Sequence, residues 1–205
     1  MVRSARKERE FNARRAEILE QAEKFFAAKG FHNVTMAQIA DASGFSIGSL
    51  YQFFKGKENL YTTMISEKID LMYAEVRKVP AAAENIIEKI DLLIDAHLQF
   101  VEKNVDFILL FVKGEQTSLS KDMTSLHKKL GEHYYDHIAF IKNILQEGVD
   151  KGLLRNLPSH DMAEALFYII RASAVQWITM PAKESLLSKK KFIMDIFLNG
   201  VKKND

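Results

Sequence analysis

The chain has 205 residues, of which 47% are hydrophobic and 27% charged, so it can bury a core and remain soluble. The absence of cysteine excludes a disulfide framework and thiol chemistry. No apolar run approaches the roughly 18 residues that a membrane span needs, and the charged first residues are not those of a signal peptide, so we expect a cytoplasmic protein without membrane contact.

Net charge is only +2, but it is unevenly distributed. Residues 1–15 hold six Lys and Arg against two Glu, which leaves the remainder of the chain slightly acidic. A basic, mobile arm on a nearly neutral body suits a polyanion partner. A solvated tail with no partner explains this segment equally well.

Apolar residues recur with a period near 3.6 almost throughout, which predicts an all-α protein of about nine helices. The expected helices cover about 12–29, 36–43, 47–53, 57–78, 83–103, 105–114 and 122–151, then a helix that follows Pro158 and Ser159 to about 179, and finally 185–202. We expect an N-terminal arm and three-helix DNA-binding domain in residues 1–56, a connecting helix in 57–78, and a C-terminal ligand-binding and dimerisation domain in 79–205.

Residues 35–61 carry the strongest local signals. Thr35 and Gln38 fit a capping box, and Gly44 can end the short helix that follows because glycine tolerates a left-handed backbone. Ser46 can cap a second short helix, with Leu50 and Phe54 on its buried side. The apolar face of the first short helix is expected to comprise Met36, Ile39, Ala40 and Ala42. Two short helices joined by a tight turn containing glycine predict a helix-turn-helix.

This segment resembles the DNA-binding motif of the TetR/AcrR family of bacterial transcriptional regulators. The matching residues are Phe31–Val34, Thr35, Ile39, Ala40, Ser43, Gly44, Ser46, Gly48–Tyr51, Phe54, Lys57, Glu58 and Leu60, together with Ile18, Ala22, Phe25, Phe26 and Gly30 upstream. The detailed resemblance covers about residues 11–70. It implies a homodimer whose C-terminal domain binds a small, often apolar ligand.

The chemistry of duplex DNA suggests roles for these side chains. Gln52 can pair with adenine and Ile47 can contact a thymine methyl, while Gly48 allows a close approach of the backbone. Tyr51 is expected to reach a phosphate, and Thr35 stands at a helix N-terminus that favours an anion. The expected DNA-binding residues are Thr35, Gln38, Ser46, Ile47, Gly48, Ser49, Tyr51, Gln52, Lys55 and Lys57. The alternative is that Thr35 and Ser46 are only caps, Tyr51 is core and the lysines are solvated.

Phe53 departs from the family pattern, which commonly has Tyr or His there. It has no polar group with which to contact the DNA backbone, so we expect it to pack or to touch sugar.

The second half contains no catalytic signature, so we expect neither an enzyme nor a cofactor. His133 and His137 have metal-ligand spacing, but no third ligand is evident; we expect solvent-facing or hydrogen-bonded histidines and no metal site. The candidate effector-binding residues are His97, Phe107, Phe111, Tyr134, Phe167, Arg171, Gln176 and Trp177. Arg171 can pair with an acidic ligand group or, alternatively, form an internal or intersubunit ion pair.

The last two helices are expected to form the dimer interface. The first of them carries the small residues Ala163, Ala165, Ala172, Ser173 and Ala174. The terminal helix carries the apolar residues Phe192, Ile193, Ile196, Phe197 and Val201. A purely internal apolar face is the alternative.

These observations favour a ligand-responsive, sequence-specific transcriptional repressor that binds a palindromic operator as a homodimer and is released by a small, largely apolar effector. One alternative is an effector-independent architectural or chromosome-organising DNA-binding protein. A second is a helical enzyme or carrier that has kept only the fold.

Overall fold

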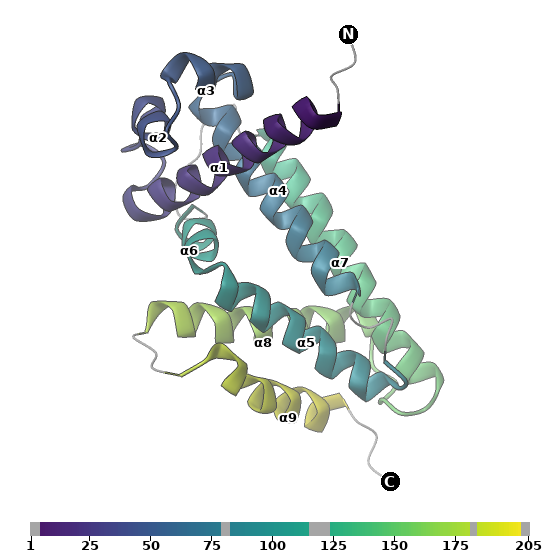
Figure 1. Cartoon of the computed structure of the whole chain (residues 1–205). Helices are drawn as coiled ribbons and strands as arrows, with labels where there is room; N and C mark the ends of the chain where they lie inside the picture. The colour runs from purple at the N-terminus through teal and green to yellow at the C-terminus, as the bar shows by residue number, and fades with distance from the viewer. Residues whose placement is uncertain (1–4, 79–82, 115–123, 181–183, 202–205) are drawn as a thin grey trace. The chain divides into compact units, whose positions relative to one another are not determined.

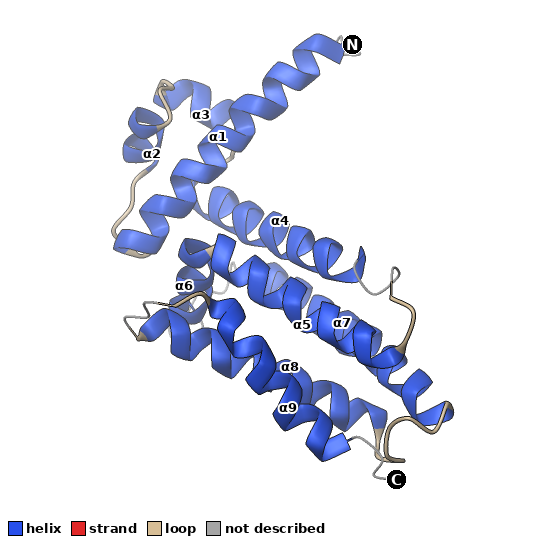
Figure 2. Ribbon diagram, turned by 60° about the horizontal axis from the view of Figure 1, so that its bottom comes forward, coloured by secondary structure: helices blue, strands red, loops and turns tan. Residues whose placement is uncertain are grey.

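The computed structural model describes residues 5–78, 83–114, 124–180 and 184–201, and these form nine α helices, one short 3-10 helix and no strand (Figures 1 and 2). The α helices are α1 (Ala5–Lys29), α2 (Met36–Ala42), α3 (Ile47–Phe53), α4 (Lys57–Lys78), α5 (Ile86–Lys103), α6 (Val105–Gly114), α7 (Thr124–Asp150), α8 (Ser159–Thr179) and α9 (Lys190–Val201). The 3-10 helix covers Leu186–Lys189. The predicted all-α class is confirmed.

Helix α1 begins at Ala5, whereas the sequence had suggested a start near residue 12. The extra turns are rich in Arg, Lys and Glu, which are good helix formers, and Arg6 pairs with Glu10 one turn away at 3.0 Å. From Ala5 onward the basic segment is therefore a helix, and the expectation of a mobile arm was wrong for these residues.

Two other helix ends differ from prediction because side chains cap them. Asn85 accepts a hydrogen bond from the Glu88 N–H at 2.9 Å, which delays the start of α5 to Ile86. Ser185 caps the 3-10 helix through the Leu187 N–H at 3.2 Å, so the last predicted helix is divided in two.

The chain forms two compact units, residues 1–68 with 106–126 and residues 69–105 with 127–205. Helix α4 runs continuously from the first into the second. Helix α6, apart from its first residue Val105, belongs to the first unit. The predicted division into a DNA-binding domain (1–56), a connecting helix (57–78) and a ligand-binding domain (79–205) is not tested by these units and stays a prediction.

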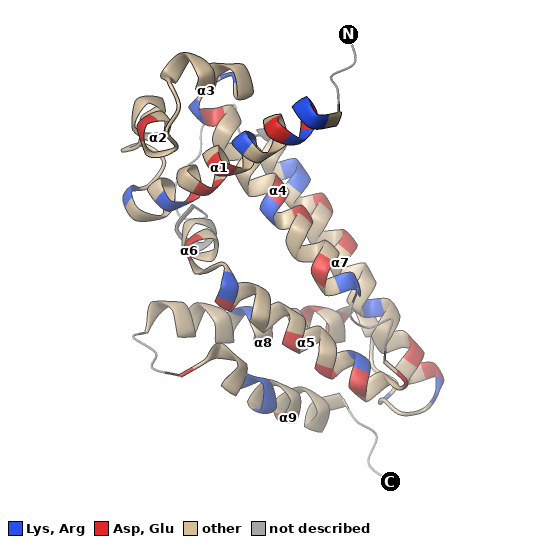
Figure 3. Cartoon of the chain, in the orientation of Figure 1, with Lys and Arg blue, Asp and Glu red and all other residues tan. Residues whose placement is uncertain are grey.

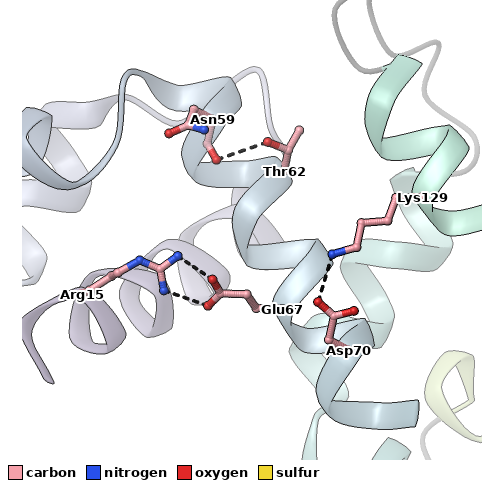
Figure 4. A network of polar contacts seen from close by, with 6 residues as sticks. All are labelled: Arg15, Asn59, Thr62, Glu67, Asp70 and Lys129. Atoms are coloured by element: carbon pink, nitrogen blue, oxygen red, sulfur yellow. Dashed lines mark hydrogen bonds and ion pairs between the residues drawn. The ribbon is translucent and has the colours of Figure 1, made fainter. Parts of the chain in front are cut away.

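In the first unit α2 packs against both α1 and α3. Its core is fully buried and comprises Ile18, Ala22, Phe26, Ile39, Leu50 and Leu60. Arg15 on α1 holds both carboxylate oxygens of Glu67 on α4, with Nη1 2.9 Å from Oε2 (Figure 4). Lys68 pairs with Glu23 at 3.1 Å. These two ion pairs fix the first half of α4 to α1.

In the second unit α5 packs against α8, α9 and the 3-10 helix, side by side in Figure 1. The second half of α4 lies against α7, where Lys129 reaches Asp70 at 3.0 Å (Figure 4). Gly148 of α7 is buried, and a Cβ added there would lie 2.7 Å from the Leu154 side chain and 3.0 Å from that of Ile86. The close approach of these three residues therefore depends on glycine.

Candidate functional site

The turn that presents α3 is built by caps. Thr35 Oγ1 accepts from the Gln38 N–H at 3.3 Å, and the Thr35 N–H donates to Gln38 Oε1 at 3.0 Å, which confirms the predicted capping box. Gly44 has φ of +71°, the left-handed conformation predicted from sequence. Ser46 Oγ accepts from the Ser49 N–H at 3.1 Å. The predicted helix-turn-helix is present.

Helix α3 buries one side and exposes the other. Leu50 is fully buried and Phe54 nearly so, as predicted. Ile47 is 48% exposed and Tyr51 52% exposed, and Gln52 is exposed beside them. Tyr51 is therefore not a core residue. The exposed face of α3 is accessible to a large partner such as duplex DNA.

The other polar residues expected at this surface also lie at helix ends. Ser49 Oγ lies 2.8 Å from Ser46 Oγ, and Gly48 is exposed.

On α2, Met36, Ile39 and Ala40 are buried, but Ala42 is exposed, so its assignment to the apolar face was wrong. Ala42 is the last residue of α2.

Lys57 is not simply a solvated lysine. Its Nζ donates to the carbonyl oxygens of Phe31 at 2.9 Å and His32 at 3.4 Å, and it lies 4.5 Å from the centre of the Phe31 ring. An ammonium group has three N–H donors, so one remains for another acceptor. Lys55 is exposed. Sequence reasoning missed the tie between Lys57 and the loop because 26 residues separate the partners.

Phe53 packs against other aromatic rings, which was one of the two expectations for this residue. Its ring centre lies 4.6 Å from that of Phe11 on α1 and 6.4 Å from that of Phe45. The stack joins the early turns of α1 to the end of α3. Those turns carry exposed basic side chains: Arg6, Lys7, Arg9 and Arg14. Figure 3 colours the Lys and Arg positions of α1 blue.

The candidate effector-binding residues are distributed over both units. Phe107 is buried in the first unit, whereas most of the others lie in the second. The side chain of Phe111 lies outside the described residues. Gln176 is exposed and Arg171 half-buried. Trp177 donates its indole N–H to the Glu184 carbonyl at 2.8 Å, so its polar atom holds a loop.

An aromatic and acidic cluster links α7 to α8. Tyr134 donates to Glu164 Oε1 at 3.0 Å, and its hydroxyl lies 3.4 Å from that of Tyr168. The pKa of Tyr134 is raised, mainly by its hydrogen bond to Tyr168 and to a smaller extent by burial and by Glu164. The Phe167 ring lies 5.5 Å from that of Tyr134. Tyr134 and Phe167 are therefore two candidates that the fold brings into contact.

His97 and His137 form a buried pair in the second unit. Their Nε2 atoms lie 2.8 Å apart, and His97 Nδ1 lies 2.7 Å from the Leu93 carbonyl oxygen. Burial lowers the pKa of His97 to about 4. Burial, and to a smaller extent the charges of His97 and Arg77, lowers the pKa of His137 to about 2. Both rings are therefore neutral at physiological pH.

Sequence spacing had associated His137 with His133, but the two face different partners. His133 Nε2 lies 2.9 Å from Asp70 Oδ1, whereas His137 bonds to His97, 40 residues away in sequence. Within the described part of the chain, no three His, Cys, Asp or Glu side chains form a group that could hold a metal ion.

Helix α9 has two apolar sides. Ile193, Phe197 and Val201 are buried in the second unit, whereas Phe192 is 55% and Ile196 48% exposed. The interface expected from sequence thus divides into an internal half and an exposed half. Among the described helices, none is long and apolar enough to cross a membrane.

The comparisons with known proteins agree with this architecture. Residues 18–64 match the model for bacterial regulatory proteins of the tetR family, and residues 65–200 match that for the C-terminal region of the YsiA-like protein. The fatty acid metabolism regulator protein of Bacillus subtilis is 22% identical over 190 residues, which cover 90% of this chain and 94% of that protein.

Two solved structures share the fold. FadR from Bacillus subtilis in complex with stearoyl-CoA has a TM-score of 0.78 at 20% identity, covering 90% of this chain and 98% of that one. The ketosteroid transcriptional regulator KstR2 of Mycobacterium tuberculosis has a TM-score of 0.74 at 21% identity, covering 93% and 96%. With both family models spanning nearly its whole length, the chain belongs to the tetR family of bacterial regulatory proteins.

Proposed function

We propose that this protein is a homodimeric transcriptional repressor that reads a palindromic operator with α3 and is released by a lipid-like effector. The observation that carries the proposal is the exposed face of α3 on a capped helix-turn-helix. Tyr51 and Ile47 are each about half exposed there and are four residues apart, so they form an exposed apolar pair on one face of the helix, which is more informative than a single exposed apolar residue.

Each side chain on this face has a role that duplex DNA can use. Gln52 can donate to and accept from adenine, and Ile47 can contact a thymine methyl. Tyr51, Lys55 and the remaining N–H of Lys57 would hold phosphates, which position the helix without reading sequence. The exposed arginines of α1 extend the basic surface towards flanking phosphates. Thr35, Gln38, Ser46, Gly48 and Ser49 complete the interface that we propose.

The dimer is proposed to form through the exposed sides of α8 and α9. Tyr168, Met180, Phe192 and Ile196, which lie on these two helices or directly after α8, are each about half exposed or more. A two-fold dimer presents two α3 helices to half-sites that lie about 34–36 Å apart or a multiple of this.

The effector is proposed to have a large apolar body, of which a long-chain acyl-CoA is the first example to test. The support is the stearoyl-CoA bound to the FadR of Bacillus subtilis. An effector releases DNA only if it binds one conformation better than the other. Continuous helix α4 connects the two units and can carry that difference. Reciprocity then makes operator DNA weaken effector binding by the same factor, typically about 5–150-fold.

Selection from a random duplex pool tests DNA reading. Wild-type protein should enrich a palindrome. Gln52→Ala should relax the preference at one or two positions per half-site, by about 1–3 kcal/mol. The matched control Lys55→Ala should weaken all sequences alike and reduce the salt dependence by about one phosphate. A pool that enriches no sequence would contradict specific reading and favour the architectural alternative.

The dimer and the effector need separate measurements. The double variant Phe192→Glu, Ile196→Glu should be monomeric by light scattering, whereas Leu71→Glu, which changes an exposed leucine on α4, should remain dimeric. Stearoyl-CoA should release wild-type protein from the selected operator. Operator affinity that no acyl-CoA changes would contradict this effector class and leave DNA reading intact.

A further inference from the structure

The hydrogen bonds of the buried histidine pair determine where its protons are. The Leu93 carbonyl can only accept, so His97 Nδ1 must carry a hydrogen. In a neutral ring, His97 Nε2 is then the acceptor, and its partner at 2.8 Å, His137 Nε2, must be the donor. The remaining nitrogen of His137, Nδ1, is therefore a bare lone pair that can only accept a hydrogen bond.

That lone pair has no partner among the described residues. His137 is fully buried, and its Nδ1 makes no hydrogen bond within the described part of the chain. A buried acceptor left unsatisfied costs about 1–3 kcal/mol, which is why such groups are rare in proteins and need an explanation. Because both pKa values lie far below neutrality, protonation of the ring does not remove the problem.

Aromatic rings lie around the His137 imidazole. The Tyr73 ring is stacked on His137 with centres 4.6 Å apart, and the centres of Phe167 and Phe140 lie 5.9 and 6.3 Å away. Phe140 and Phe167 are only half-buried, so two of the walls reach the surface. The rings come from α4, α7 and α8, and all lie in the second unit. The lining is mainly aromatic, and the Arg77 guanidinium, 5.9 Å from the centre of the Phe140 ring, is a second polar group close to His137.

We infer that His137 Nδ1 is the polar anchor of the effector site and accepts a hydrogen bond from a hydroxyl or N–H group on an otherwise apolar ligand. The inference rests on the proposed effector function of the second unit and narrows its chemistry. His97 is a positioning residue: its bond to Leu93 holds His137 in the tautomer that accepts.

The anchor selects for a donor. A carboxylate, ester or thioester oxygen would face a lone pair and be repelled, and a charged ammonium would lose its hydration among the aromatic rings. A neutral donor has two sources in acyl-CoA chemistry: a hydroxyl on the acyl chain and the amide N–H groups of the pantetheine arm. Both give the same contact at Nδ1, and suitable probes separate them.

Nitrogen NMR of protein with ¹⁵N-labelled histidines tests the anchor directly. Without ligand, the spectra should show His97 protonated on Nδ1 and His137 on Nε2. Saturation of the intact protein with methyl β-hydroxydodecanoate should move the His137 Nδ1 resonance towards the hydrogen-bonded position, whereas methyl dodecanoate should leave it in place. If dodecanoyl-CoA alone moves it, the donor is a pantetheine amide instead.

Affinities test the same contact by mutation. Wild-type protein should bind the hydroxylated ester about tenfold more tightly than the plain ester, the value of one net hydrogen bond. His137→Phe should remove this ratio while keeping affinity for the plain ester. His127→Phe, the same change at an exposed histidine of α7, should preserve the ratio.

The outcomes distinguish the anchor from the wider proposal. An Nδ1 resonance already hydrogen-bonded in the free protein and unmoved by any probe would assign a buried water to this atom and overturn the inference. So would acyl-CoA that releases the operator without moving the resonance, although the proposed repressor function would then stand. Failure of every probe to bind would overturn the inference and the proposed effector class, and would leave the proposed DNA reading intact. The wild-type spectra decide even if His137→Phe does not fold.

Discussion

In the first unit, polar side chains near the proposed DNA-binding surface lie at helix ends, whereas in the second unit two polar side chains are buried against each other. Thr35 and Ser46 cap α2 and α3 within three residues and remain near water. His97 and His137 meet across 40 residues, with no water-facing side. When a capping side chain is removed, water can replace its hydrogen bond. When one histidine of a buried pair is removed, the other is left without a hydrogen-bond partner. The first unit should therefore weaken gradually under substitution, except at its apolar core.

The largest effect should come from that core. Phe26→Ala should destabilise the protein by about 3–5 kcal/mol, because the ring is fully buried between Phe31 and Tyr61 and leaves a cavity. Phe25→Ala, a neighbour that is only half-buried, should cost much less. Urea unfolding at one fixed protein concentration measures both. Equal losses would mean that the first unit does not depend on its apolar centre.

Acid should affect the second unit through its histidines. The folded-state pKa of His97, about 4, lies below the unfolded value of about 6.5, so the unfolded chain binds a proton that the folded chain does not. Stability should therefore fall as the pH drops from about 6.5 to about 4, by roughly 3 kcal/mol for this group. The double variant His97→Leu, His137→Phe should lose less over the same range. Identical pH profiles in urea unfolding would contradict the buried neutral pair.

Two glycines of α7 sharpen the contrast between close packing and local propensity. Gly148→Ala should destabilise by about 1–3 kcal/mol, because the added Cβ would overlap Leu154 and Ile86, both buried. Gly131→Ala meets nothing within 4 Å and should stabilise by up to about 1 kcal/mol through helix propensity alone. Thermal unfolding should show opposite shifts. Shifts of the same sign would contradict the packing at Gly148.

The smallest effect should come from a cap. Thr35→Ala should cost about 1 kcal/mol of stability, since it removes the acceptor of the Gln38 N–H, and Thr35→Ser should cost little because it retains the hydroxyl. Chemical unfolding resolves the difference. A larger loss in operator affinity than in stability would indicate that Thr35 also contacts a phosphate. No difference between the two variants would mean that this cap contributes nothing.

The parts of the molecule that could be predicted from sequence are those whose causes are local. The capping box, the left-handed Gly44 and the buried side of α3 all depend on residues within four positions of one another. The start of α1 was missed because the composition of residues 1–15 was interpreted as a basic tail. In the structure, i,i+4 charge pairs support a helix there. The Lys57 tie and the histidine pair were missed because each joins distant segments. Spacing along one helix associated His137 with His133, but packing between α5 and α7 decides its partner.

The indole of Trp177 has a consequence for measurement. It is the only tryptophan in the chain, and it lies on α8 with its N–H on the Glu184 carbonyl. Fluorescence excited selectively at the indole therefore reports on the second unit alone, while far-ultraviolet dichroism reports on all helices. A gap between the two signals along a melting curve would show the units losing structure separately, with no label or engineered probe.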